Sequence, residues 1–228
     1  MLLRKWTDLP SELRNDDVKK YYDILTNKKI NLIFKKLFDF LVSLFLIILL
    51  SPIMLVIAIW IKIDSQGPVF FKQTRITQYN RQFKIYKFRT MVVNAEQLGE
   101  SVTQKNDSRI TKVGEKIRNS RLDELPQLFN IIKGEMSFVG TRPEVKKYVD
   151  SYTNEMYATL LLPAGITSIA SITYKDEDKV IEKYKNDKNT VDDIYINYVL
   201  PEKMKLNLKS LQEFTFLKDI ATCIKTVF

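Results

Sequence analysis

The longest apolar segment of this chain runs from Leu41 to Ile61 and contains no charged residue. A helix of about 20 consecutive apolar residues can cross a bilayer. Ser51-Pro52 lies at the midpoint of the segment, and a proline inside a helix removes one hydrogen bond and bends the axis. The pattern therefore predicts either a spanning helix or a re-entrant helix that breaks at Ser51 and Pro52. In the second case the Ser51 hydroxyl would satisfy a carbonyl that the break frees.

Both flanks of the apolar segment are basic, which bears on the choice between the two topologies. Lys28, Lys29, Lys35 and Lys36 precede it, and Lys62 is the first of several lysines and arginines that follow it. A spanning helix would place one of these groups on the outer side, against the tendency of Lys and Arg to remain cytoplasmic. A re-entrant helix keeps both groups inside. The residues alone leave both topologies open.

Two runs rich in aromatic and branched residues, 69–76 and 82–89, are separated by a short polar segment and predict a β-hairpin. The second run alternates strictly, so Lys87 and Arg89 fall on the same face as two apolar residues. Charged residues at the end of an apolar face are unusual. Their ordinary explanation is that the strand ends there and both side chains reach into water.

Other elements follow from periodicity and from the placement of glycine and proline. We expect a helix over 111–119, a short buried strand over 136–139, a helix over about 144–162, and charged amphipathic helices over 176–228 with a break at Pro201. The last of these helices carries apolar residues along one side, from Phe214 to Phe228. Such a side suits docking on a core, which we favour, or a membrane interface.

Two adjacent carboxylates, Asp123 and Glu124, precede Pro126 and a helical apolar pattern. Because proline is tolerated in the first turn of a helix, the pair is expected at or near a helix N-terminus, where the helix dipole favours anions. The ordinary explanation of an aspartate at this place is an N-cap. Taken alone, these residues favour the cap over a catalytic role.

Composition narrows the chemistry that the chain can perform. Its 228 residues suit one domain, or one domain with a membrane element. Lys and Arg total 36 against 27 Asp and Glu, and the net charge of +9 suits an anionic membrane, nucleic acid or phosphorylated substrates. No histidine is present, which excludes histidine acid–base catalysis, and the single cysteine, Cys223, cannot form an internal disulfide. Carboxylates, cationic side chains, hydroxyls and a hard metal ion remain as catalytic groups.

Several motifs occur in order along the chain. Besides the apolar segment with Ser51-Pro52, they are Gly67–Arg75, Tyr86–Met91, Arg109–Gly114, Leu122–Leu128, Lys133–Gly140 and Arg142-Pro143. From about Asn31 to its C-terminus the chain resembles the bacterial sugar transferases, also called monotopic phosphoglycosyl transferases. Each motif alone is a weak signal, but this many in order is specific.

The resemblance implies transfer of a sugar 1-phosphate from a UDP-sugar to polyprenyl phosphate, usually undecaprenyl phosphate, with release of UMP. This would be the first membrane step of surface glycan or glycoconjugate assembly. By the resemblance the reaction is ping-pong and uses Mg²⁺. Asp123 matches the nucleophile that forms a phosphosugar–enzyme intermediate, Glu124 matches its assisting glutamate, and the pair holds the metal. The apolar helix would be re-entrant and would anchor the enzyme on the cytoplasmic face of the bacterial inner membrane.

Cationic side chains in the motifs are candidates for binding the substrate phosphates. Arg142 is the first choice, because a guanidinium binds two phosphate oxygens in a planar fork. Lys87 and Arg89 come next, and Arg109 and Gln127 complete the predicted phosphate site. These groups, with Mg²⁺, would offset the repulsion between an anionic nucleophile and an anionic diphosphate.

Two departures from the family pattern bear on these assignments. Thr141 stands where much of the family has proline, but Arg142 is kept. Residues 162–168 differ from the common pattern in the half of the chain that we associate with sugar selectivity, so the sugar is not carried over.

The expected fold is α+β and mostly helical. It comprises a polar arm over 1–30, a re-entrant membrane helix over 31–63 and a cytoplasmic catalytic domain over 64–228, with a short hairpin and amphipathic interfacial helices. The expected partners are a UDP-sugar, polyprenyl phosphate and the phospholipid bilayer, and no nucleic acid. Two alternatives stay open: a membrane-anchored basic scaffold or lipid-binding protein without catalysis, and a nucleotidyl- or phosphotransferase with a soluble acceptor.

Overall fold

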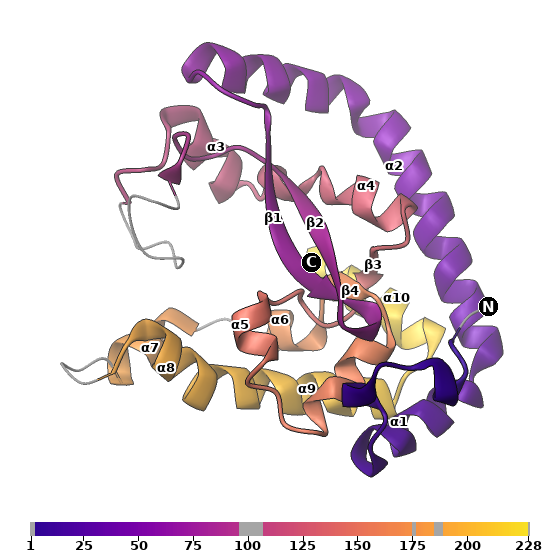
Figure 1. Cartoon of the computed structure of the whole chain (residues 1–228). Coiled ribbons are helices and arrows are strands. Elements are labelled where there is room, and N and C mark those ends of the chain that lie inside the picture. Colours follow the sequence, from indigo (N-terminus) through magenta and orange to yellow (C-terminus); the bar gives the residue numbers. More distant parts are fainter. Residues whose placement is uncertain (1–2, 96–106, 175–176, 185–188, 228) are drawn as a thin grey trace.

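The computed structural model describes residues 3–95, 107–174, 177–184 and 189–227, and these residues are mostly helical with two small sheets. Figure 1 shows helix α2 (Lys29–Asp64) as an arc around one side of the molecule. The hairpin of β1 (Phe70–Thr77) and β2 (Arg81–Phe88) lies near the centre, and helix α9 (Leu200–Gln212) runs below it. The mostly helical α+β class is confirmed.

From residue 3 onward, the N-terminal segment packs on the core. It contains two 3₁₀ turns, η1 (Trp6–Asp8) and η2 (Ser11–Leu13), and helix α1 (Asp16–Thr26). The Asn15 side chain caps α1 by accepting a hydrogen bond from the Val18 amide at 3.0 Å. Val18, Tyr21 and Leu25 point into the core, so α1 is an ordinary amphipathic helix with its apolar face buried.

Helix α2 continues through Ser51 and Pro52, so the prediction of a break in the helix there was wrong. Proline removes only its own N–H, which leaves the carbonyl of Ile48 without its helical donor. The Ser51 hydroxyl donates to that carbonyl at 2.8 Å, as the sequence suggested. This bond replaces the missing one, and Figure 1 shows that the helix curves instead of stopping.

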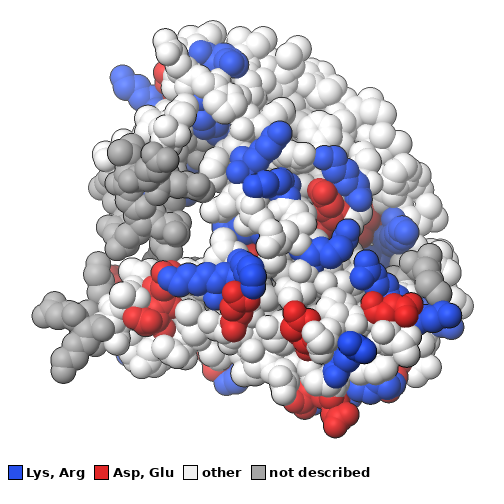
Figure 2. All heavy atoms as spheres, viewed as in Figure 1, with Lys and Arg blue, Asp and Glu red and all other residues white. Residues whose placement is uncertain are grey.

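The first half of α2 is inverted relative to α1, because it buries polar residues and exposes apolar ones. Lys35, Asp39 and Ser43 are buried and lie four residues apart on one face. Phe45 is 61% exposed and Ile48 is 67% exposed. Figure 2 shows that the surface along α2 is mostly uncharged. By length and composition, α2 is the one helix of the described residues that could cross a membrane.

The predicted hairpin is confirmed. β1 and β2 pair antiparallel with Gln73 opposite Ile85. Tyr79 and Asn80 at the turn both have positive φ, which matches the right-handed twist of a hairpin. β2 also binds helix α4 (Gln127–Ile132), since Asn130 donates to the Lys84 carbonyl at 2.8 Å and accepts from the Tyr86 amide at 3.0 Å.

Four further elements complete the part of the molecule around the contact between β2 and α4. They are helix α3 (Lys112–Asn119), the 3₁₀ turn η5 (Leu122–Glu124), β3 (Met136–Val139) and β4 (Ala164–Thr167). The predicted helix over 111–119 and the predicted strand over 136–139 are confirmed. β3 and β4 pair in parallel with Met136 opposite Ala164 and Val139 opposite Thr167, so the end of β3 lies beside the end of β4.

The predicted helix over 144–162 was wrong, because the segment forms separate short pieces. These are helix α5 (Lys146–Val149) and the 3₁₀ helix η6 (Met156–Leu161), followed after β4 by helix α6 (Ile169–Thr173). Tyr148, Val149, Leu160 and Leu161 are all buried in the same core cluster. Tertiary packing of these side chains thus prevails over helical continuity.

The C-terminal part contains helices α7 (Glu177–Tyr184), α8 (Val191–Ile194), α9 and α10 (Phe216–Val227). The predicted break at Pro201 was wrong, because a π-helical turn, Tyr195–Val199, leads directly into α9, which holds the proline in its first turn. In α10, Leu217 is 77% exposed and Ile224 is 55% exposed. The apolar side of α10 is therefore not fully docked on the core.

Candidate active site

Asp123 and Glu124, here called the dyad, lie in the 3₁₀ turn η5, between α3 and α4. Arg121 adopts the left-handed conformation, with φ 56°, and turns the chain at the end of α3. Leu122 and Leu125 pack against a core cluster that includes Phe88 of β2. These contacts fix the two carboxylates beside the end of β2. Helix α4 has only six residues and begins after Pro126. The two carboxylates therefore lie in the short turn before the helix and not in its first turn.

Glu124 is held by two cationic side chains. The Lys87 ammonium lies 2.8 Å from Glu124 Oε1, and Arg142 Nη2 lies 3.4 Å from the same oxygen. Burial opposes ionisation of Glu124, but Lys87 and Arg142 outweigh it and hold the pKa of this carboxyl at about 2. Glu124 is therefore a fixed anion. Lys87 therefore pairs with Glu124 and does not reach into water, which is the ordinary outcome for a charged residue at the end of a strand.

Asp123 has a different environment although it is the adjacent residue. It is half-buried, and no described side chain donates a hydrogen bond to its carboxylate. Burial raises its pKa, Lys87 and Arg118 oppose that rise, and the neighbouring Glu124 charge adds to it. Of the two carboxylates, Asp123 is the one that remains available to a ligand.

A small pocket, here called the dyad pocket, adjoins Glu124, because the two cations that bind this carboxylate line it. Lys87, Gln127 and Arg142 line it, as the sequence predicted for a phosphate site. Arg75 of β1 lines it as well. The sequence placed Arg75 at the end of the motif Gly67–Arg75 but did not assign it to the phosphate site. The alternation of the hairpin was the signal that could have found it, because Arg75 shares a face with Lys87.

The turn that carries Arg142 approaches β4 closely, and glycine permits this. A Cβ atom on Gly165 would lie 2.2 Å from the Gly140 nitrogen, so no side chain fits there. Two hydrogen bonds fix the approach: the Gly140 amide donates to the Thr167 carbonyl at 3.0 Å, and the Gly165 amide donates to the Thr141 carbonyl at 2.9 Å. Gly165 of β4 thus supports the position of the turn that carries Arg142.

Arg89 is not at the dyad, contrary to its predicted place in the phosphate site. Its guanidinium donates to the Gln66 carbonyl at 2.6 Å and to the Ser65 carbonyl at 2.7 Å. Gly67 leaves the room for it, because a Cβ there would lie 2.0 Å from Arg89 Nη1. Arg89 lies beyond the last residue of β2, so it reaches the loop after α2 and holds that loop in place.

Arg109 also has other described partners. Its guanidinium forms an ion pair with Asp107 at 2.6 Å and donates to the Ala95 carbonyl at 2.9 Å. The structure thus brings Lys87, Gln127 and Arg142 to the dyad, whereas the described contacts of Arg89 and Arg109 lie elsewhere.

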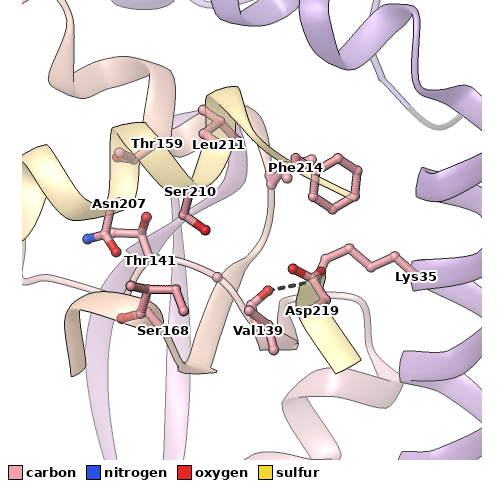
Figure 3. Close-up of a pocket in the computed structure, with 13 residues that line it drawn as sticks. Lys35, Val139, Thr141, Thr159, Ser168, Asn207, Ser210, Leu211, Phe214 and Asp219 are labelled. Atoms are coloured by element: carbon pink, nitrogen blue, oxygen red, sulfur yellow. Dashed lines mark hydrogen bonds and ion pairs between the residues drawn. The ribbon is translucent and has the colours of Figure 1, made fainter. Parts of the chain in front are cut away.

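A second group of charges, here called the anchor cluster, consists of Lys35, Asp39 and Asp219. Lys35 donates to Asp219 of α10 at 2.6 Å and to the Val139 carbonyl at 2.7 Å, and Asp39 accepts from the Phe138 amide at 3.1 Å. Figure 3 shows Lys35 extending from α2 toward Asp219 and Val139, at the edge of a pocket lined by both polar and apolar side chains. The cluster joins α2 and α10 to the end of β3, shortly before Arg142.

The dyad suits a hard divalent cation that is shared with a substrate. Mg²⁺ prefers oxygen ligands and is commonly bound by one or two carboxylates together with substrate phosphates. Asp123 and Glu124 supply two carboxylates, and the described residues contain no group of three or more acidic or cysteine side chains placed for a metal. The donor set therefore fits an ion completed by phosphate oxygens, not an all-protein cage.

Comparison with known proteins decides the family. The sequence profile described as "Bacterial sugar transferase" matches residues 30–228, which is most of the chain. The chain belongs to the bacterial sugar transferase family. The matched region begins with α2 and contains both the dyad pocket and the anchor cluster, whereas α1 lies outside it.

Several members of the family are similar to this chain in sequence. A UDP-N-acetylgalactosamine-undecaprenyl-phosphate N-acetylgalactosaminephosphotransferase of Aeromonas hydrophila is 45% identical over 61% of this chain. A UDP-glucose:undecaprenyl-phosphate glucose-1-phosphate transferase of Klebsiella pneumoniae is 41% identical over 68% of it. An enzyme of the same name from Escherichia coli is 30% identical over 87%. The alignments span only 34%, 34% and 40% of these relatives, respectively.

Proposed function

We propose that this protein transfers a sugar 1-phosphate from a UDP-sugar to a polyprenyl phosphate, such as undecaprenyl phosphate, and releases UMP. The proposal rests on the environment of Asp123. No described side chain donates a hydrogen bond to this carboxylate, and its charge is influenced by Lys87 and Arg118, while the adjacent Glu124 is already bound by Lys87 and Arg142, which line the dyad pocket. Family membership and the names of the relatives support the same reaction.

The reaction would proceed as two displacements at one phosphorus atom. In the first, an Asp123 oxygen forms a bond to the β-phosphorus of the UDP-sugar, and the bond from that phosphorus to the bridging oxygen breaks, so that UMP leaves with the electron pair. In the second, an oxygen of the polyprenyl phosphate attacks the same phosphorus and releases the Asp123 carboxylate. The chemistry needs no histidine, because a carboxylate is already ionised at neutral pH.

Positive charge must offset the repulsion between the Asp123 carboxylate and the diphosphate. Lys87 and Arg142 lie at the dyad and would contact the phosphate oxygens. Mg²⁺, held by Asp123, Glu124 and diphosphate oxygens, would supply further neutralisation. Glu124, whose pKa is about 2, keeps Lys87 and Arg142 in place before the substrate arrives.

We further propose that α2 anchors the protein in the cytoplasmic face of the inner membrane as a re-entrant helix. Many of its apolar residues, such as Phe45 and Ile48, face outward, whereas Lys35, Asp39 and Ser43 face the domain, which suits lipid better than water. The curvature at Pro52 allows the helix to enter and return. Leu217 and Ile224 of α10 extend the apolar surface. A polyprenyl acceptor keeps its tail in lipid, so an enzyme at that depth can reach its phosphate.

Cysteine labelling tests this topology. Native Cys223 is first replaced by serine, and single cysteines are then placed at Lys29 or Lys62, which are exposed at the two ends of α2. A re-entrant helix protects both positions from an impermeant thiol reagent in intact cells. Labelling of one end only establishes a spanning helix.

Release of UMP from a panel of UDP-sugars tests the activity. The panel contains UDP-glucose, UDP-galactose and UDP-N-acetylgalactosamine, with Mg²⁺ and undecaprenyl phosphate. At least one donor should give UMP and a lipid-linked sugar phosphate, and chelation of Mg²⁺ should stop the reaction. Absence of UMP with every donor contradicts the proposal and favours a membrane-anchored scaffold.

A further inference from the structure

Arg75 of β1 is the third cationic side chain of the dyad pocket. Residues opposite each other in the hairpin share a face, and Gln73 pairs with Ile85. Arg75 and Lys87 therefore lie on the same face, on either side of this pair. Both line the pocket, together with Arg142.

The partners of Arg75 differ from those of the other two cations. Lys87 and Arg142 share the carboxylate of Glu124. Arg75 instead donates to the neutral amide oxygen of Gln73, at 2.6 and 3.0 Å, and to the carbonyl of Pro143 at 3.3 Å. Among the described residues, no carboxylate lies within ion-pair distance of Arg75. Glu124 thus pairs directly with two of the three lining cations, whereas Glu144 acts on Arg75 only from beyond ion-pair distance.

Arg75 lies in the pocket beside a second guanidinium, that of Arg142. Burial lowers the pKa of the Arg75 guanidinium, the nearby Glu144 opposes this change, and Arg142 adds to it. Two cations that face one pocket repel each other, and an anion placed between them removes the repulsion. A doubly charged phosphate group has the charge and the oxygen geometry for two guanidinium groups.

We propose that Arg75 binds the phosphate of the leaving UMP and that the acceptor phosphate then binds at the same place. This inference rests on the proposed function. In each in-line displacement the incoming and leaving oxygens lie on opposite sides of the phosphorus. Since UMP leaves from the side opposite Asp123 and the acceptor must attack from that side, the two phosphates need one site in succession. Arg75 is the lining cation that Glu124 does not engage.

A purely structural role for Arg75 makes a different prediction. Its contact with the Pro143 carbonyl helps to hold the turn that carries Arg142, but the Ile76 amide also holds this turn by donating to the Glu144 carbonyl at 2.9 Å. If Arg75 only supported the turn, its loss would lower stability and turnover together, and the affinity of folded protein for UMP would not change selectively.

Three variants separate these roles. Arg75→Gln removes the charge and keeps a donor for Pro143, Arg75→Lys keeps the charge without the fork, and Arg81→Gln removes an exposed arginine at the start of β2 as a control. The measurements are equilibrium binding of UMP, which needs no turnover, and the KM for undecaprenyl phosphate. In Arg75→Gln both constants should rise roughly ten- to hundredfold. Arg75→Lys should restore part of the affinity, and Arg81→Gln should match the wild type.

Unchanged UMP binding in folded Arg75→Gln overturns the inference, and so does weaker UMP binding with an unchanged KM for the acceptor. If Arg75→Gln does not fold, Arg75→Lys carries the test, because loss of the fork should still weaken both constants. Failure of the proposed function is a separate result: the wild type would then release no UMP from any donor, whatever the variants bind.

Discussion

The anchor cluster and the dyad pocket contain the same types of charged residue in opposite arrangements. In the anchor cluster each charge has a fixed partner within the protein. Lys35 lies between Asp219 and the Val139 carbonyl, and Asp39 accepts from the Phe138 amide. The cluster is buried between α2, β3 and α10, and its groups are already satisfied.

In the dyad pocket the charges are not satisfied by the protein alone. Glu124 is engaged by both Lys87 and Arg142, Arg75 has neutral partners, and no described side chain donates to Asp123. A lysine beside two carboxylates therefore does not by itself indicate a catalytic site. A carboxylate left available next to excess positive charge does, because that combination is stabilised only when an anionic ligand binds.

The same substitution in both regions should have opposite consequences. Asp123→Asn should lower UMP release by roughly 10⁴-fold or more, because it removes the proposed nucleophile, and it should leave the fold intact. Asp219→Asn should retain most of the activity per folded molecule and lower the free energy of unfolding by about 1–3 kcal/mol, because Lys35 loses a buried anion. Activity and thermal unfolding in detergent are measured on both variants. Loss of activity in Asp219→Asn alone would reverse the comparison.

Removal of the lysine from each region should lower the free energy of unfolding by very different amounts. Lys35→Met leaves two carboxylates buried without a cation and should lower the free energy of unfolding by about 3–5 kcal/mol. Lys87→Met should cost much less stability, since the Lys87 side chain is 25% exposed and Arg142 still binds Glu124. Denaturant titration of the two variants checks this order. Equal losses of stability would show that the dyad pocket is as structural as the anchor cluster.

Removal of Lys87 and removal of Glu124 should shift the pH dependence of activity in opposite directions, because these two neighbouring charges act oppositely on the pKa of Asp123. The proposed nucleophile must be ionised, so activity falls as the pH drops through its raised pKa. Lys87 lowers this pKa, and Lys87→Met should therefore move the acid limb of the profile to higher pH. Glu124 raises it, and Glu124→Gln should move the limb to lower pH while impairing the rate severely. The profiles are measured as kcat/KM for the UDP-sugar, and shifts in the same direction would contradict the assigned field.

The smallest expected effect concerns the curve in α2. Ser51→Ala leaves the Ile48 carbonyl without a donor and should lower the free energy of unfolding by about 0.5–1.5 kcal/mol. Val56→Ala, on the exposed side of the same helix, serves as the control. A loss in Val56→Ala as large as that in Ser51→Ala would mean that the hydroxyl does not replace the bond that Pro52 removes.

Most of the residues that gather around the dyad could be predicted from the sequence. Asp123, Glu124, Lys87, Gln127 and Arg142 stand in short motifs, and the structure brings them together. Arg89, which is only two residues from Lys87, does not lie with them. Arg89 has the same alternation phase as Lys87, but it lies beyond the end of β2, where backbone carbonyls of the preceding loop bind it. The alternation of a strand predicts on which face of the sheet a side chain lies, but it does not predict which groups bind that side chain.

The anchor cluster could not be predicted, because its partners are far apart in the chain. Lys35 was counted as part of a basic flank, whereas Asp219, its partner, lies 184 residues away. The predicted break at Pro52 failed for a local reason, since one hydroxyl replaces the lost bond. The predicted helix over 144–162 failed because burial of Tyr148 and Leu161 in one core prevails over local propensity.

The central claim is that Asp123 carries the sugar phosphate between donor and acceptor. Its most direct test is intact-protein mass spectrometry after incubation with the active UDP-sugar and Mg²⁺ in the absence of acceptor. The account predicts a mass increase of one sugar phosphate, located by peptide mapping to Asp123, absent in Asp123→Asn, present in Asp219→Asn, and lost on addition of undecaprenyl phosphate. Release of UMP only when the acceptor is present, with no adduct on the protein, would contradict it.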